Sequence, residues 1–599
     1  SAILWQDKAN DIPRARAAFE SVVELDPSYG DVFPRLQAIY VAEGARAELA
    51  ALLKKRLDAV TDPAERVEME VLRGRALAAV GDSAAAKRAL AAALEANPDH
   101  VEALSAFGDV AASEGDWSGA EQAWIRLARL VPDSARQAAI YLRLGEIYDE
   151  HLPNPERAEL AYQEILKRDP ADVGARERLV ALFQRQGDAP RAIEQQTLLI
   201  NAAEAPEAKC VRTTELARIY EATGDAKKAE ATLLQARKTW PKDEAALGAL
   251  ARFYQRNGQA PAANMLLERA VADARRALGT GRFEPYLFST VATVAELRSR
   301  PDAARVAQAA VAALDGADAA LDGAGASAAD IKLDDLLAPE VMTPAFRELL
   351  QLTGPLLDTA VPFDIAAVRG SPLPAQLNDL GDLIRNIAAG YGIDDLQIFV
   401  SSAIGSVCVP VSAHPPVLLL GQNLVASDRE DVRTFLVHRA LKILQSNTAA
   451  ISRTAPIDLW PLLAAYLKAH SPSWAPQGVD AGKLNDFYGK ITRVAGQRAV
   501  DPQVALLASE VIGSIGNRAS TLNTVINGWG NRAGLLAMGD LNVAITGIAW
   551  AGGHANAPPA AGKDRMTWIG RNAEARELVV FSVSDAYADA RGQLGLNSA

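Results

Sequence analysis

The chain has 599 residues, of which 49% are hydrophobic and 23% charged, and its net charge is −12 at pH 7. One hydrophobic core does not organise so long a chain, so we expect at least two domains. Phosphate binding needs a basic face, and this acidic sequence has no long run of Lys and Arg, which argues against a general nucleic-acid binder. The two cysteines, Cys210 and Cys408, give no metal-binding spacing, and no apolar run reaches the roughly 18 residues that cross a bilayer.

The first residues, SAILWQDKANDIPRA, lack an initiator Met and the basic and apolar regions of a signal peptide. They are typical of the middle of a helical repeat, so we expect a processed or truncated piece of a longer protein. The Ala- and Arg-rich composition indicates a high-GC bacterium. Two cysteines suit the cytoplasm and the periplasm equally, so the compartment stays open.

Residues 1–313 repeat with a period of 34 to 38 residues, which predicts a solenoid of helix pairs. Glycine or aspartate would end the first helix of each pair, and a small Ala five residues later would let the two helices approach closely. Proline would close the second helix before the next pair. The recurring residues are Pro27, Pro63, Pro98, Pro132, Pro170, Pro206 and Pro241, with Ala86, Ala120, Ala192, Ala229 and Ala263 after the turns.

This pattern resembles the tetratricopeptide repeat, with a small residue at position 8 and an aromatic at position 11, as in Ala217 and Tyr220. About seven repeats and one atypical helical pair would fill residues 1–313. The resemblance implies a scaffold that binds a protein partner along the concave face of the first helices. Charged residues of that face would form the partner groove, and the basic end would include two arginines four residues apart on one helix face. The candidates are Arg75, Asp109, Glu146, Arg218, Arg252 and Arg256.

Residues 314–340 are rich in Gly, Ala and Asp and predict a flexible linker. Residues 341–599 mix strand-like and helical patterns, which predicts an α+β domain and a mostly α chain overall. Predicted strands include FDIAAV, LQIFVSS, SVCVPVSA and PPVLLLG, followed near the end by MTWIG and ELVVFSV. A helix is predicted over SDREDVRTFLVHRALKILQ, where Ser427 and Glu430 would form a capping box.

The order of PPVLLLG, the helix with His438 and the later NGWGNRAG resembles the gluzincin metallopeptidases of the HtpX and minigluzincin type. His438 matches the first zinc ligand of that family. Arg439 stands where the catalytic Glu belongs, and Lys442 stands where the second His belongs. In the later helix Asn527 replaces the third ligand, a Glu, and Asn531 replaces an Asp. Zinc needs neutral or anionic ligands, so the resemblance implies a pseudopeptidase without metal, cofactor or catalytic residue.

The favoured hypothesis is a non-enzymatic scaffold within a bacterial multiprotein assembly. The solenoid would recruit a partner, and the pseudopeptidase domain would add a second binding surface, for example by pairing an extended segment with an edge strand. Self-association through the open end of the solenoid is a further expectation. Three alternatives stay open. They are an active hydrolase or metallopeptidase with an unusual C-terminal site, a repeat domain acting alone, and an unrelated α+β domain whose His-Arg-Lys helix faces solvent.

Overall fold

The computed structural model describes residues 2–7, 11–26, 29–317, 320–321, 333–496, 500–553 and 558–596. Their contacts divide the chain into two compact units, Ser1–Trp240 and Pro241–Ala599, called unit 1 and unit 2 below. Within the described residues, no helix is both long and apolar enough to span a bilayer. The predicted domain limits at residues 313 and 340 stay a prediction. Of the predicted linker, residues 318–319 and 322–332 lie outside the described residues.

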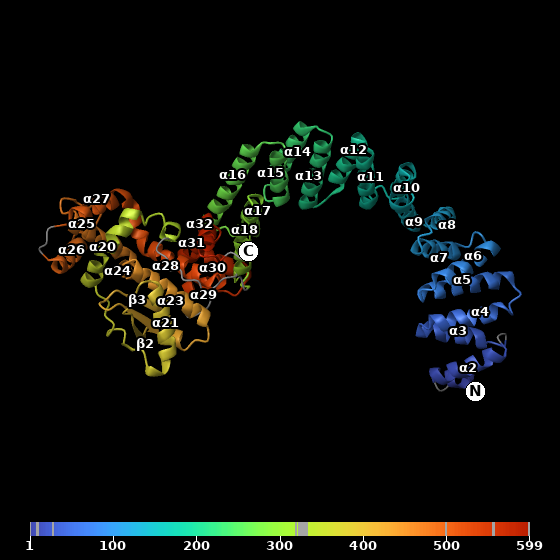
Figure 1. Cartoon of the computed structure of the whole chain (residues 1–599), viewed down its shortest axis with the longest axis horizontal. Helices are drawn as coiled ribbons and strands as arrows, with labels where there is room; N and C mark the ends of the chain where they lie inside the picture. Colours follow the sequence, from blue (N-terminus) through green and yellow to red (C-terminus); the bar gives the residue numbers. More distant parts are fainter. Residues whose placement is uncertain are drawn as a thin grey trace. The chain divides into compact units, whose positions relative to one another are not determined.

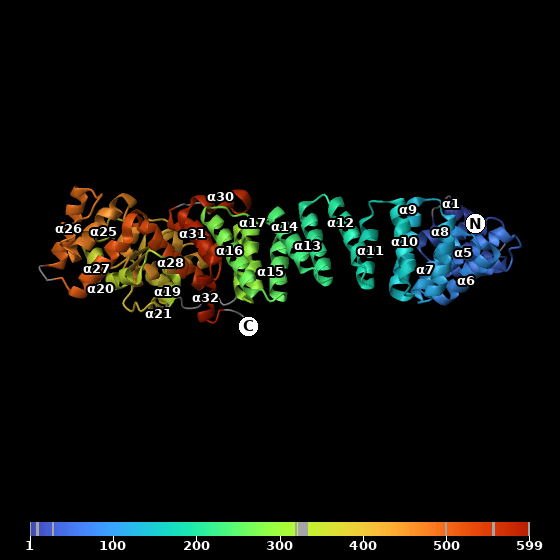
Figure 2. The ribbon, with the colours of Figure 1, turned by 90° about the horizontal axis from the view of Figure 1, so that it is seen from above.

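Unit 1 is a series of antiparallel helix pairs that follow one another along the chain (Figures 1 and 2). Its elements are α1 (Ala2–Asp7), α2 (Ile12–Leu25), α3 (Val32–Glu43), α4 (Arg46–Leu57), α5 (Pro63–Ala79), α6 (Ser83–Ala96), α7 (Val101–Ser113), α8 (Trp117–Leu130), α9 (Ser134–Glu146), η1 (Ile147–His151), α10 (Pro155–Arg168), α11 (Val173–Gln186), α12 (Ala189–Ala202), α13 (Pro206–Ala222) and α14 (Ala226–Thr239).

The predicted Gly turn and small-residue spacing are confirmed at the positions given below, while Pro27 lies outside the described residues. Gly187 ends α11 with φ 75°, a left-handed conformation that glycine adopts without steric cost. Ala192, five residues later, is completely buried where α12 meets α11. At Gly145 a Cβ atom would lie 2.4 Å from Cε1 of Tyr162, so only glycine lets α9 and α10 approach this closely. Small residues therefore set the spacing of the pairs.

Unit 2 begins with two further helix pairs and continues into a mixed region. Its elements are α15 (Glu244–Arg256), α16 (Ala260–Gly279), α17 (Pro285–Leu297), α18 (Pro301–Leu314), α19 (Asp334–Leu337), α20 (Pro344–Ala360), β1 (Gly370–Pro372), η3 (Ala375–Leu377), α21 (Asn378–Gly390), β2 (Gln397–Ser401), β3 (Cys408–Val411), β4 (Val417–Gly421), α22 (Gln422–Val425), α23 (Glu430–Gln445), α24 (Ala449–Arg453), α25 (Pro456–His470), α26 (Ala481–Ala495), α27 (Pro502–Ile515), η4 (Gly516–Thr521), α28 (Leu522–Met538), α29 (Leu541–Ala551), α30 (Gly562–Arg571), α31 (Ala573–Ser582) and α32 (Asp585–Gln593).

The sheet of unit 2 has the strand order β1-β2-β4-β3. Strands β2 and β4 are parallel, while β1 and β3 pair antiparallel at the two edges. Every residue of β4 is buried, as expected for a central strand. Helix α23 contacts the edge strand β3 and packs against α21, α28 and α29. The chain is thus mostly helical, with a helix-pair solenoid followed by an α+β region, which confirms the predicted fold class.

Helices α16 and α18 pack against the last helices of the chain, which places residues far apart in sequence side by side (Figures 1 and 2). Arg275 of α16 forms an ion pair of 2.9 Å with Asp585. The guanidinium of Arg565 is buried and donates to the carbonyl of Ala313 at 2.9 Å. These contacts join the helix pairs at the start of unit 2 to its C-terminal helices.

Three strand predictions were wrong. The FDIAAV segment forms turns before β1, and the segments MTWIG and ELVVFSV lie in helices α30 and α31. Leu578, Val579 and Phe581 of α31 are all buried. A helix in the middle of a core can carry β-branched and aromatic residues, because tertiary packing outweighs their weak preference for strands.

Candidate functional site

Helix α23 is covered by other elements on nearly every side. This burial tests the expectation that its His, Arg and Lys side chains face solvent. His438 and Arg439 are each 7% exposed, and Lys442 is 1% exposed. The apolar residues of the helix surround these three polar ones, so no face of its middle is left for solvent. The expected solvent exposure of the His-Arg-Lys helix was therefore wrong, while an unrelated α+β domain stays an open alternative.

The predicted capping box of α23 was also wrong. The helix begins at Glu430 with Arg429 as its N-cap residue, and no side chain caps it. Ser427 lies one turn earlier, where its Oγ accepts the backbone N–H of Arg429 at 3.1 Å. The tight turn from Asp428 to Glu430 delays the helix by two residues, so Ser427 cannot reach the first free N–H groups.

His438 contacts a tyrosine from α21's C-terminal end. Its Nδ1 lies 3.0 Å from the hydroxyl of Tyr391, within hydrogen-bonding distance, and both side chains are buried. Burial lowers the pKa of His438 to about 4, because the charged imidazolium would lose its hydration. The ring is therefore neutral near pH 7 and packs against the tyrosine as part of the core.

Arg439 has its own partners on α28 and α31. Its Nε donates to Oδ1 of Asn531 at 2.8 Å, and its Nη2 lies 3.3 Å from Oε2 of Glu574. Asn531 is completely buried and donates to the same Glu574 oxygen at 2.9 Å. The carboxylate that balances Arg439 thus comes from the C-terminal part of the chain. Two predicted positions, Arg439 and Asn531, are brought together, whereas Asn527 is half-buried outside this group.

The close approach of α23 and α28 depends on two glycines. A Cβ on Gly530 would lie 2.7 Å from the carbonyl oxygen of Arg439, and one on Gly534 would lie 2.8 Å from the Phe435 ring. These glycines stand one residue before Asn531 and three residues after it. The NGWGNRAG motif therefore packs against the helix that carries His438.

Lys442 is the most deeply buried of the three polar residues of α23. Its ammonium is paired with the carboxylate of Asp334 from α19, and it also donates to Oε1 of Gln445 at 2.8 Å. The same Nζ lies 4.9 Å from the ring centroid of Trp529, a cation–π contact. Burial lowers the pKa of Lys442, and the negative charge of Asp334 opposes that shift.

These contacts do not fit a zinc site. Within the described part of the chain, no three His, Cys, Asp or Glu side chains are grouped closely enough to hold a metal ion. His438 faces a tyrosine, and the two positions that would complete the family motif carry cations with their own partners. A dication placed among them would meet repulsion that grows as the dielectric constant falls.

A cavity of about 980 Å³ opens beside this cluster. Asp334 of α19, Tyr391 and Trp529 lie in its wall, and the C-terminal end of α23 borders it. Carboxylates outnumber cations around it. The charged lining residues are Asp334, Asp335, Glu348, Asp394, Asp395 and Arg347.

The middle of the edge strand β3 offers no free backbone group to an added strand. Pro410 has no N–H to donate, and its carbonyl accepts a hydrogen bond of 2.8 Å from Nη1 of Arg453. The other side of that guanidinium faces the buried carboxylate of Asp358, 3.3 Å away. An extended segment could not pair with the strand at Pro410 without displacing Arg453, which disfavours the predicted strand pairing at β3.

In unit 1 the acidic groove candidates are joined to arginines of the following pair. Asp109 of α7 forms an ion pair with Arg143 of α9, and Glu146 forms one of 2.9 Å with Arg178 of α11. Glu177 continues the series with Arg212 at 2.8 Å. Such exposed pairs contribute roughly 0–1 kcal/mol each, but they leave the acidic groove residues less available to a ligand.

The basic groove candidates differ from the acidic ones. Arg75 and Arg218 of unit 1 are exposed and form no ion pair with any residue that the structure describes. In unit 2, Arg252 and Arg256 are also exposed on α15, and Arg256 interacts with another group of the protein. The predicted groove residues therefore separate into paired carboxylates and exposed arginines.

Three partners in the α23 cluster were missed by sequence reasoning, namely Asp334, Tyr391 and Glu574. Asp334 lies in a segment whose composition predicts a linker. A signal was present in Leu333 and Leu337, two leucines four residues apart around that aspartate, which is the spacing of one buried helix face.

Comparison with solved structures finds tetratricopeptide repeat proteins. No family model matches the sequence, and no curated protein matches it. A tetratricopeptide repeat protein from Parabacteroides merdae is 18% identical over 42% of this chain and 94% of its own, with a TM-score of 0.24. MamA from Desulfovibrio magneticus RS-1 is 22% identical over 29% and 93%, with a TM-score of 0.24. YrrB, described as a repeat protein with an unusual peptide-binding site, is 23% identical over 29% and 85%, also with a TM-score of 0.24.

Proposed function

We propose that this chain is a non-catalytic protein-interaction scaffold. Its helix-pair array recruits a protein partner along the face that carries Arg75 and Arg218, and its C-terminal region supplies a second binding surface. That region is a pseudopeptidase of the gluzincin type, whose sheet, helix α23 and helix α28 persist without the chemistry. The protein works inside a larger bacterial assembly, and copies of the array associate through their open ends.

One observation carries the non-catalytic part of the proposal. The positions of the catalytic Glu and the second His hold Arg439 and Lys442, and each cation is bound to a carboxylate or amide of the protein itself. An arginine does not accept a proton from water at any working pH, and a paired lysine ammonium has no lone pair. The residues of α23 stabilise the core and activate no water.

The exposed arginines support the choice of partner. Arg218 is exposed on α13 and has no ion pair among the residues described, whereas the carboxylates at corresponding places are already paired. Guanidinium groups bind carboxylates with two parallel hydrogen bonds. The array therefore selects acidic segments of its partner.

Selection from a random dodecapeptide library on the immobilised whole chain tests this function. We expect enrichment of peptides rich in Asp and Glu. Arg218→Glu should weaken their binding at least tenfold, because it replaces an attraction by a repulsion. Affinities of the enriched peptides, measured by fluorescence anisotropy, check this expectation.

Arg129→Glu provides the matched control. Arg129 is also exposed and lies in the last turn of α8, the second helix of its pair. Its charge reversal should leave the affinity within twofold of the wild type. Enrichment of no peptide, or equal losses in the two variants, would overturn the proposal for the array.

A further inference from the structure

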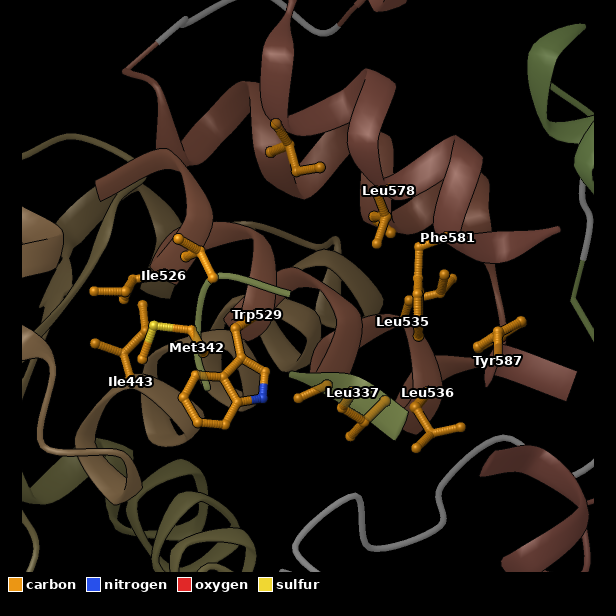
Figure 3. Packing of buried hydrophobic residues seen from close by; sticks show 14 of the residues in the cluster. Leu337, Met342, Ile443, Ile526, Trp529, Leu535, Leu536, Leu578, Phe581 and Tyr587 are labelled. Atoms are coloured by element: carbon orange, nitrogen blue, oxygen red, sulfur yellow. The ribbon is translucent and has the colours of Figure 1, made fainter. Parts of the chain in front are cut away.

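A short segment, residues 333–342, begins inside the predicted linker and packs into the core of unit 2. Leu333, Leu337 and Met342 are 1%, 0% and 2% exposed. They are this deeply buried although α19, which starts after Leu333 and ends at Leu337, has only four residues. Helix α19 contacts α28 and α32. Figure 3 places Leu337 near Trp529 and Leu536 of α28, and Met342 near Ile443 of α23.

Polar contacts also hold this segment. The carboxylate of Asp334 is the counter-ion of the buried Lys442. The carbonyl of Leu337 accepts a hydrogen bond of 3.0 Å from Nη1 of Arg532, whose other nitrogens bind Glu577. The two leucines four residues apart lie on one face of a helical turn, which is the spacing by which a hydrophobic groove holds a helix. The carboxylate beside the first leucine and the hydrogen-bonded carbonyl of the second add two polar contacts.

The segment borders open space on one side. Asp334 and Asp335 lie in the wall of the 980 Å³ cavity described above, and the side chain of Asp335 is 83% exposed. A competing segment could therefore approach Lys442 from the cavity without prior unfolding of α23 or α28.

We propose that residues 333–342 are an intrachain ligand. The second surface of the proposed function is then the groove lined by α23, α28 and α32, and its ligand is a partner's helical turn of the same chemistry. That turn carries aliphatic residues four apart and an Asp directly after the first of them. Lys442 selects the carboxylate, because an uncompensated ammonium at this depth is costly. This inference rests on the proposed second surface and is independent of the repeat groove.

A labelled peptide of residues 333–344, LDDLLAPEVMTP, tests the inference on the whole chain. The tethered segment competes at an effective concentration on the order of millimolar, so the wild type should bind the peptide weakly. Leu333→Ser with Leu337→Ser weakens the internal ligand, and we expect this variant to bind the peptide at least tenfold more tightly. Fluorescence anisotropy measures both affinities.

Three controls give the test its specificity. A peptide in which the first Asp is Lys should lose at least tenfold in affinity for the variant. Leu506 of α27 is 70% exposed, and the Leu506→Ser variant should bind the peptide as weakly as the wild type does. Lys442→Met in the variant background should also abolish the preference for the Asp peptide over the Lys peptide.

Hydrogen exchange of the α28 amides shows whether the double variant stays folded. If those amides stay protected and the peptide binds neither chain, the segment is ordinary core and the inference is overturned. If α28 loses protection, the milder Leu333→Ala replaces the double variant, and absence of tighter peptide binding there would also overturn it. Neither result affects the Arg218→Glu experiment. A failure of the intrachain-ligand proposal can therefore be told apart from a failure of the proposed peptide binding by the helix-pair array.

Discussion

Replacing Asp334 with asparagine is expected to lower the free energy of unfolding of unit 2 by about 3–5 kcal/mol, because the change leaves the buried ammonium of Lys442 without a counter-charge. The side chain of Lys442 is 2% exposed and that of Asp334 is 16% exposed, so the ammonium that loses its counter-charge has little contact with solvent. The remaining partners, Gln445 and the Trp529 ring, carry no net charge.

Removing both charges should be far less harmful than removing one. Asp334→Asn combined with Lys442→Met is expected to recover most of the loss, since no unpaired ion then remains buried. Hydrogen exchange of the α23 and α28 amides in urea reports the stability of unit 2 without interference from unit 1.

The adjacent aspartate offers a matched control. Asp335 pairs with Arg347 at 2.7 Å, but its side chain is 83% exposed. Asp335→Asn should therefore cost less than about 1 kcal/mol. Equal effects of the two asparagine substitutions would show that Lys442 does not depend on a buried counter-ion.

Two buried groups of unit 2 should give opposite pH dependences. Burial raises the pKa of Asp358 to about 6, even though Arg453 opposes this shift. The stability this group contributes is present below its unfolded pKa of about 4 and is lost as the pH rises through 6. Burial lowers the pKa of His438 to about 4, so its contribution is present above about 6.5 and is lost as the pH falls through 4. Each change amounts to roughly 3 kcal/mol.

The variants Asp358→Asn and His438→Gln separate these contributions. Relative to the wild type, Asp358→Asn should gain stability as the pH rises from 4 to 7, and His438→Gln should gain it as the pH falls over the same range. Hydrogen exchange of β3 and α23 amides at several pH values measures both differences. If the stability difference between variant and wild type does not change with pH, or changes in the same direction for both variants, the assigned protonation states are contradicted.

The sequence predicted the repeat array well, because its rules act over short distances. A turn at Gly187 and a small residue at Ala192 are local requirements, and both are met as expected. The strands predicted near the end failed, because a buried helix such as α31 carries the same apolar residues as a strand. The hydrophobic residues near the C-terminus correctly indicated a buried segment. Whether that segment forms a strand or a helix depends on its packing against distant elements.

The site was predictable in its residues and not in their partners. His438, Arg439 and Lys442 could be named from one helix. Their partners Tyr391, Asn531 and Asp334 lie 47, 92 and 108 positions away in sequence, and no local pattern pairs them. Burial of the helix on every side follows from these distant contacts, which explains why a solvent-facing helix stayed an open alternative in the sequence.

Zinc content most directly tests the proposal that unit 2 contains a pseudopeptidase, in which α23 holds paired cations at the positions of a peptidase's metal ligand and base. Whole protein equilibrated with zinc and then passed through a desalting column is expected to retain no stoichiometric metal, as measured by plasma mass spectrometry. His438→Ala should leave that result unchanged. Stoichiometric zinc that a chelator removes with loss of stability, and that His438→Ala abolishes, would contradict the account.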